Sequence, residues 1–108
     1  MVKTKDEIIN LIKQYVSIIS KKIKVEKVVL FGSYAKGEPL NCSDVDLVII
    51  SKDFQNMSFL KRLEFLQLHW KFNIGADIIG YTPEEYNSLS KKISLVSEIN
   101  NTGIEVGF

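Results

Sequence analysis

The chain has 108 residues, of which 45% are hydrophobic and 25% are charged, so its size and composition fit a single globular domain over residues 1–108. Its 14 basic and 13 acidic residues give a formal net charge of +1, which argues against a long electrostatic footprint on a nucleic acid. One cysteine excludes an internal disulfide, and no apolar run has the length of a membrane span, so we expect a cytoplasmic protein that does not contact a membrane.

The first part of the chain predicts a helix followed by a strand. Thr4 and Glu7 have the spacing of a capping box, in which a threonine and a glutamate three residues later satisfy free backbone N–H groups. Apolar residues then recur at helical spacing, which predicts an amphipathic helix over residues 4–21 that covers a sheet. Residues 25–31 end in an apolar run and predict the first strand.

Turn-forming residues separate this strand from a second one. Gly32 and Ser33 form the first turn, and Gly37 is placed to end a short helix. In chain order we expect a short helix over residues 33–36, a loop over residues 38–43, a strand over residues 44–50 and a polar connection over residues 51–56.

The rest of the chain predicts further helices and two more strands. Residues 57–72 form a helix that is apolar on nearly all sides, and such a helix is either deeply buried or lies at an interface. Thr82, Pro83 and Glu85 are the cap, the first and the third position of another helix. We also expect a turn over residues 73–75, a strand over residues 76–81, helices over residues 82–92 and 94–101, and an edge strand over residues 104–108. Together these elements predict an α/β fold with a small mixed β-sheet packed by helices.

Two aspartates stand at the start of the second predicted strand. Aspartate is depleted in strands, yet Asp44 and Asp46 lead directly into an apolar run. Because side chains alternate along a strand, the two share one face while Val45 points the other way. Two carboxylates that close repel unless a cation lies between them, and their oxygen atoms suit Mg²⁺. The pattern predicts a magnesium site, and the alternative is a pair of solvated acids at a strand entry.

The turn at Gly32 and Ser33 predicts the other half of such a site. Glycine lets the backbone come close to a ligand, and a helix that opens at Ser33 would direct free N–H groups toward an anion. A simple turn is the alternative. A phosphate cradle beside a carboxylate pair is the apparatus of metal-assisted phosphoryl or nucleotidyl transfer.

This combination of residues resembles a known family. Gly32-Ser33, ten further residues, then Asp44-x-Asp46 and an apolar run are similar to the signature of the DNA polymerase beta-like nucleotidyltransferases. The length is similar to that of their minimal nucleotidyltransferase branch, which is often paired with HEPN-domain toxins. The resemblance covers nearly the whole chain and includes Asp77 in I-G-A-D-I-I-G-Y, T-P-E-E-Y and the ending N-T-G-I-E-V-G-F.

The resemblance implies the polymerase beta-like nucleotidyltransferase fold and a role for each site residue. Asp44 and Asp46 would ligate two Mg²⁺ ions. Asp77 would be the third carboxylate, ligate the catalytic ion and help to orient or deprotonate the incoming hydroxyl. The triphosphate would be held by Gly32, Ser33 and Lys36. The family more often has arginine in place of Lys36, and lysine offers a point charge instead of a bidentate fork.

The resemblance also implies a reaction and a partner. The reaction would move a nucleoside monophosphate, AMP from ATP, to an acceptor hydroxyl, with pyrophosphate leaving. The acceptor would be a tyrosine of a HEPN toxin, so that the chain acts as an antitoxin. One alternative is a non-catalytic antitoxin that neutralises a HEPN partner by direct binding. Another is nucleotidyl transfer to RNA or a small molecule, against which the near-neutral charge and the short chain argue. The sequence leaves the oligomeric state open, homo- or hetero-oligomer.

Overall fold

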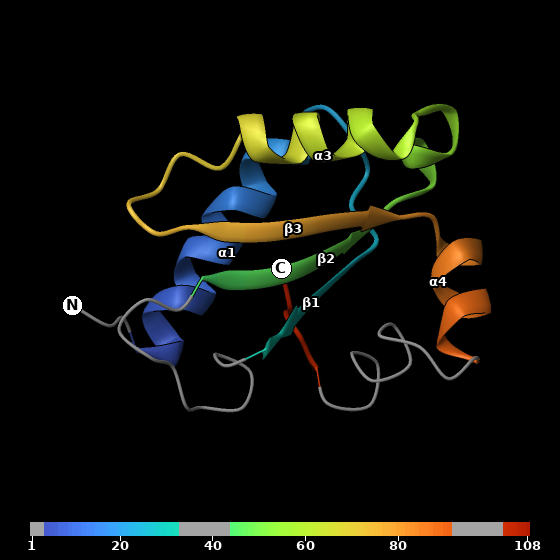
Figure 1. Cartoon of the computed structure of the whole chain (residues 1–108). Coiled ribbons are helices and arrows are strands. Elements are labelled where there is room, and N and C mark those ends of the chain that lie inside the picture. Colours follow the sequence, from blue (N-terminus) through green and yellow to red (C-terminus); the bar gives the residue numbers. More distant parts are fainter. Residues whose placement is uncertain (1–3, 33–43, 92–102) are drawn as a thin grey trace.

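The computed structural model describes residues 4–32, 44–91 and 103–108 (Figure 1). The expected short helix over residues 33–36, the loop over residues 38–43 and the helix over residues 94–101 lie outside the described residues. The elements are, in chain order, α1 (Lys5–Ile19), β1 (Lys27–Phe31), β2 (Val45–Ile50), the 3-10 helix η1 (Lys52–Asn56), α3 (Phe59–Leu68), β3 (Ala76–Tyr81), α4 (Pro83–Ser90) and β4 (Ile104–Glu105).

The four strands form one mixed sheet in the order β3-β2-β1-β4. β1 pairs antiparallel with both β2 and β4, whereas β2 and β3 run parallel. A parallel neighbour requires a crossover connection, and η1 and α3 supply it between β2 and β3. The predicted α/β fold with a small mixed sheet packed by helices is confirmed. The predicted edge strand is shorter than expected, because β4 has two residues.

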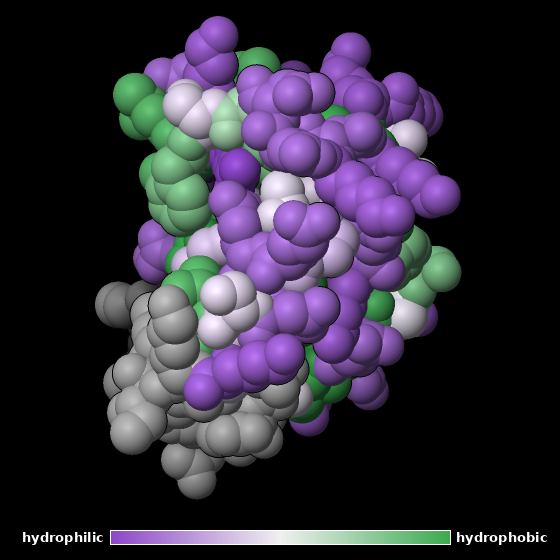
Figure 2. Space-filling view, turned by 90° about the vertical axis from the view of Figure 1, so that its right-hand side faces the viewer, coloured by the Kyte–Doolittle hydropathy of each residue, from purple (hydrophilic) through white to green (hydrophobic). Residues whose placement is uncertain are grey.

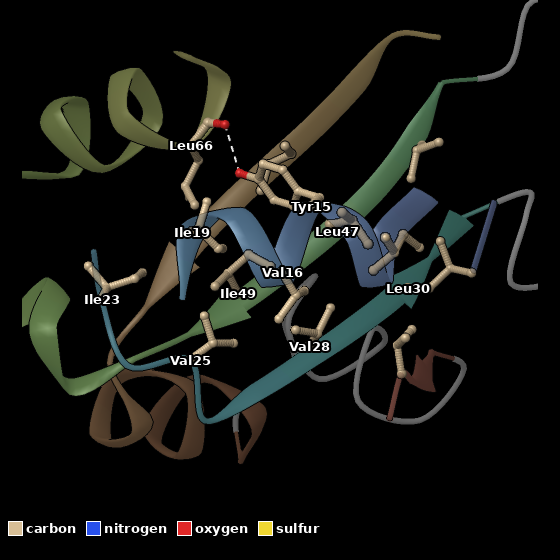
Figure 3. Packing of buried hydrophobic residues seen from close by; sticks show 14 of the residues in the cluster. Tyr15, Val16, Ile19, Ile23, Val25, Val28, Leu30, Leu47, Ile49 and Leu66 are labelled. Carbon is tan, nitrogen blue, oxygen red and sulfur yellow. Dashed lines mark hydrogen bonds between the residues drawn. The ribbon is translucent and has the colours of Figure 1, made fainter. Parts of the chain in front are cut away.

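α1 begins at the predicted cap and packs as its sequence pattern predicts, although the Glu7 side chain accepts from the Thr4 hydroxyl at 3.2 Å, which is not the contact of a capping box. The Thr4 side chain accepts a hydrogen bond from the Glu7 backbone N–H at 3.2 Å, which caps the first turn. The helix lies against one face of the sheet, where its apolar side chains contact those of β1 and β2 (Figure 3). The residues that α1 buries are Ile8, Ile12, Tyr15, Val16 and Ile19.

The core between α1 and the sheet is closed by α3. Leu47 and Ile49 of β2 are fully buried in it, together with Leu66 of α3. The Tyr15 hydroxyl donates a hydrogen bond to the Leu66 carbonyl oxygen at 2.7 Å, so a polar group inside the core is satisfied (Figure 3). Burial raises the pKa of Tyr15 well above its ordinary value, so the phenol keeps its proton.

α3 is shorter and more exposed than its apolar pattern predicts. It ends at Leu68 instead of at residue 72, because the Trp70 ring turns back onto Tyr15, with the ring centroids 5.1 Å apart. The Trp70 indole N–H then donates to the Ile74 carbonyl at 2.7 Å and closes a turn. Of the two predicted alternatives, deep burial is excluded, since Leu60 and Leu68 are 65% and 69% exposed, and a position at an interface stays a prediction.

The surface on the right-hand side of Figure 1 is mostly hydrophilic, and its hydrophobic residues form separate areas (Figure 2). Among the described residues, no helix combines the length and the apolar composition that crossing a membrane requires.

The predicted polar connection after β2 forms a 3-10 helix. Ser51 is buried and its side chain accepts from the Asp53 N–H at 3.1 Å, which starts η1. Phe54 is fully buried and anchors this short helix in the core. The cap and the buried ring act together with hydrogen bonds that join the segment to residues before β1, from the Lys24 N–H to Asp53 and from the Lys52 N–H to Glu26.

Arg62 is a buried charge at the junction of η1, α3, β3 and α4. Its Nε donates to the carbonyls of Phe54 and Met57 at 3.1 and 3.2 Å. Its Nη1 donates to the Gly80 carbonyl at 3.2 Å and to Glu85 Oε1 at 2.7 Å. Glu85 also closes the predicted capping box with Thr82 at the start of α4.

The outer edge of β3 lies beside α3 (Figure 1). The carbonyls of Gly75 and Tyr81 accept N–H groups of the β2 side, so the carbonyls of Ala76 and Gly80 point outward. The Gln67 side chain donates to the Ala76 carbonyl at 2.8 Å, and Arg62 donates to the Gly80 carbonyl. Of the carbonyls on this edge, those of Ala76 and Gly80 therefore have a partner from α3.

Candidate active site

The parallel pairing of β2 with β3 brings the predicted carboxylates to one edge of the sheet. Asp46 is the second residue of β2, Asp77 is the second residue of β3, and the register places these two opposite each other. Asp44 precedes β2 by one residue. Residues opposite each other in neighbouring strands project to the same face, so Asp46 and Asp77 lie side by side.

The two paired aspartates lie on the face of the sheet that α1 does not cover. Val45, Leu47 and Ile78 point into the core beneath α1. Asp46 and Asp77 alternate with them and therefore project the opposite way. Asp46 is partly buried, whereas Asp44 and Asp77 are exposed to solvent.

The electrostatics of Asp46 reflect this crowding. Burial, and after it the negative charges of Asp77 and Asp44, together raise the pKa of Asp46 from 3.8 to about 6. Each of these causes disfavours the ionised carboxyl in the absence of a cation. A divalent cation beside Asp46 would reverse the effect, so the site has the charge that favours metal binding.

Gly32 contacts the same carboxylate from the end of β1. Its φ is +74°, a conformation that glycine adopts without strain. A Cβ atom on Gly32 would overlap Oδ2 of Asp46. The backbone of Gly32 thus lies close to the Asp46 carboxylate, and its approach to a phosphate stays a prediction. Ser33 and Lys36, the other predicted phosphate-binding residues, lie outside the described residues.

The carboxylates of Asp44, Asp46 and Asp77 suit Mg²⁺, although they do not form a complete coordination shell. Across residues 4–32, 44–91 and 103–108, no three histidine, cysteine or acidic side chains are grouped closely enough to hold a metal ion. Mg²⁺ does not need such a shell, since it keeps several waters and binds through one or two carboxylates and the substrate phosphates. Asp44 and Asp77 are exposed and can rotate toward Asp46, so the residues fit this ion.

Gly75 is a neighbour of the site that sequence reasoning treated only as part of a turn. A Cβ atom there would lie 2.5 Å from Oδ1 of Asp44. Nothing in the local sequence indicates this proximity, because it depends on how the turn before β3 lies across the start of β2.

Comparison with known proteins decides the family. The family model described as the nucleotidyltransferase domain matches residues 12–102, which includes the paired aspartates. The chain belongs to the nucleotidyltransferase domain family. The nucleotidyltransferase is 33% identical over 102 residues to a protein of Methanocaldococcus jannaschii named "putative protein adenylyltransferase", covering 93% of this chain and 99% of that one. A second protein of the same name and organism is 35% identical over 65 residues, or 60% of this chain and 65% of that one.

Solved structures show the same fold. A crystal structure described as a putative nucleotidyltransferase from Sulfolobus solfataricus superimposes with a TM-score of 0.69 and 20% identity, over 94% of this nucleotidyltransferase and 80% of that chain. A toxin-antitoxin structure with AMP-PNP superimposes with a TM-score of 0.57 and 19% identity, over 92% of this chain and 72% of that one.

Proposed function

We propose that this nucleotidyltransferase is a Mg²⁺-dependent protein adenylyltransferase that moves AMP from ATP to a hydroxyl group. The observation that carries the proposal is the pairing of Asp46 with Asp77 beside the backbone of Gly32. The name of the M. jannaschii relatives supports AMP as the group and a protein as the acceptor.

Each site residue has a role in this reaction. Asp44 and Asp46 would hold Mg²⁺, which supplies charge neutralisation for the phosphates and for both the attacking and leaving oxygens. Gly32, with Ser33 and Lys36, would hold the triphosphate. Asp77 would orient the acceptor hydroxyl and accept its proton. The acceptor oxygen would then bond to the α-phosphorus, the bond from the α-phosphorus to the bridging oxygen would break, and pyrophosphate would leave.

The acceptor in this proposal is a tyrosine of a HEPN toxin, and the nucleotidyltransferase is the antitoxin. The toxin-antitoxin structure with AMP-PNP supports an antitoxin role, since it shares this fold. An AMP group adds negative charge and bulk, and near an RNase site both would oppose the entry of an RNA phosphate.

A second candidate is an antitoxin that neutralises the HEPN protein by binding alone. It is favoured by the absence, among the described residues, of side chains already grouped to hold a metal ion. Under this candidate the carboxylates would have no catalytic role.

Intact mass spectrometry of the cognate toxin distinguishes the two candidates. The HEPN toxin of the proposal would be incubated with the nucleotidyltransferase, Mg²⁺ and ATP. We expect the mass to rise by one or more adenylyl groups with the wild type and not with Asp44→Asn or Asp77→Asn. Asp53→Asn is the matched control, because Asp53 lies beyond the opposite end of β2. If Asp44→Asn silences the toxin as well as the wild type does and leaves its mass unchanged, the binding-only candidate is correct.

A further inference from the structure

The carboxylates of Asp44 and Asp46 each lie against a glycine. The Asp46 carboxylate lies against Gly32 at the end of β1, and the Asp44 carboxylate lies against Gly75 before β3. A Cβ atom on Gly75 would be 2.5, 3.0 and 3.4 Å from Oδ1, Cγ and Oδ2 of Asp44. Gly75 therefore occupies the same relation to Asp44 as Gly32 does to Asp46.

The backbone at Gly75 does not itself require glycine. Among the described glycines, Gly32 is the one with a positive φ, so the backbone of Gly75 is compatible with alanine. Gly75 is also exposed, and its side-chain position faces no packed core. The atoms in the way of a methyl group are those of the Asp44 carboxylate.

Two contacts hold Gly75 in place. Its carbonyl accepts the Val45 N–H at 2.9 Å, which ties it to the residue that follows Asp44. The preceding carbonyl, that of Ile74, accepts the Trp70 indole N–H at 2.7 Å, and the Trp70 ring packs on Tyr15. The turn is thus fixed to the core, whereas the Asp44 side chain is exposed. A methyl group at residue 75 would move the carboxylate instead of the backbone.

We propose that Gly75 is a positioning residue, whose lack of a side chain leaves the Asp44 carboxylate room to turn toward Asp46 and Asp77. The proposal rests on the proposed function, in which Asp44 is a metal ligand. It assigns to Gly75 no contact with the metal ion or the nucleotide. Outer residues that orient a ligand typically contribute 10–100-fold to metal affinity, so we expect Gly75→Ala to weaken Mn²⁺ binding by about tenfold or more.

Three glycines of the chain provide a matched set of alanine variants. In Gly80→Ala the new methyl would lie 2.9 Å from Phe54 Cε2 in the core, so this variant should lower the melting temperature without changing the site. In Gly107→Ala nothing lies within 4 Å of the new methyl, so neither property should change. Gly75→Ala should instead weaken Mn²⁺ binding and leave the melting temperature unchanged, because the exposed Asp44 carboxylate can rotate away from the new methyl at little cost.

The experiment measures Mn²⁺ binding by electron paramagnetic resonance, with and without a non-hydrolysable ATP analogue, together with the melting temperature of the apo protein. We expect about tenfold weaker Mn²⁺ binding for Gly75→Ala at an apo melting temperature close to that of the wild type. In an Asp44→Asn background, at Mn²⁺ concentrations that still give measurable occupancy, Gly75→Ala should have no further effect.

Two results would overturn the proposal while leaving the function intact. One is wild-type Mn²⁺ affinity in Gly75→Ala when Asp44→Asn binds weakly. The other is an equal loss from Gly75→Ala with and without the Asp44 carboxylate, because the glycine would then act through another group. If instead the wild type does not bind Mn²⁺, or Asp44→Asn binds it equally well, the proposed function itself fails.

Discussion

Replacing Arg62 by methionine tests whether this buried charge holds the crossover connection to the sheet. Methionine keeps much of the length of the side chain but none of its five donors. The change removes the bonds to the carbonyls of Phe54, Met57 and Gly80 and the pair of bonds to Glu85, at 2.7 and 3.3 Å.

The expected cost follows from the burial of each partner. The Arg62 side chain is 6% exposed, whereas that of Glu85 is 43% exposed, so Glu85 regains water when its partner is lost. We therefore take about 1 kcal/mol for the ion pair, below the 3–5 kcal/mol of a fully buried pair. Three carbonyls that lose a donor add about 1 kcal/mol each. The sum is about 4 kcal/mol, a large part of the 5–15 kcal/mol that stabilises a typical domain.

Urea unfolding followed by circular dichroism measures this loss. Lys61→Met is the matched control, since Lys61 is exposed on the same helix and should change the free energy of unfolding by less than about 0.5 kcal/mol. Arg62→Lys should fall between the two, because lysine keeps the charge but cannot reach all four partners at once. A loss below about 1 kcal/mol for Arg62→Met would refute the reasoning, because the bonds would then contribute nothing net.

Three further predictions concern the site. Since the pKa of Asp46 is about 6 in the folded protein and 3.8 without its surroundings, the folded protein binds more protons between these values, and apo stability should fall as the pH rises from about 4 to about 6. Asp46→Asn should remove this fall of about 1 kcal/mol, discounted for solvent screening, in urea titrations across that range. Gly32→Val should abolish ATP binding by calorimetry while the circular dichroism spectrum is retained, and unchanged affinity would refute the phosphate cradle. Asp44→Asn should leave the apo melting temperature unchanged or raise it and lose the stabilisation by Mg²⁺-ATP, which is about 2.7 kcal/mol for the wild type at 100 times Kd. Lower apo stability with an intact Mg²⁺-ATP response would mean that Asp44 is structural.

The parts of the fold that local patterns encode were predictable. The caps of α1 and α4 depend on residues three positions apart, and the predicted Thr82–Glu85 capping box is present. The pairing of Asp46 with Asp77 follows from two aspartates that each stand at the start of an apolar strand, once those strands run parallel. Local spacing therefore carried the fold class, whereas Asp77 was expected at the site only through the family resemblance, and its pairing with Asp46 came from the structure.

Contacts between distant segments were not predictable from local patterns. α3 ends where the Trp70 ring packs against Tyr15, which lies 55 positions earlier in the chain. Helical periodicity cannot predict a contact between residues so far apart. The proximity of Gly75 to Asp44 likewise arises from the way a turn crosses a neighbouring strand. Such relations are set by tertiary packing, which overrides the local preference of a segment.

The two partnered carbonyls on the edge of β3 limit how another protein can associate with this one. An open strand edge is a template on which a foreign strand can add itself by backbone hydrogen bonds. Here an incoming strand would first have to displace Gln67 from the Ala76 carbonyl and Arg62 from the Gly80 carbonyl. Displacing Arg62 would also loosen η1 and α4, so the chain would lose part of its own folding free energy. At this edge, a binding partner is therefore expected to recognise side chains instead of adding a strand beside β3.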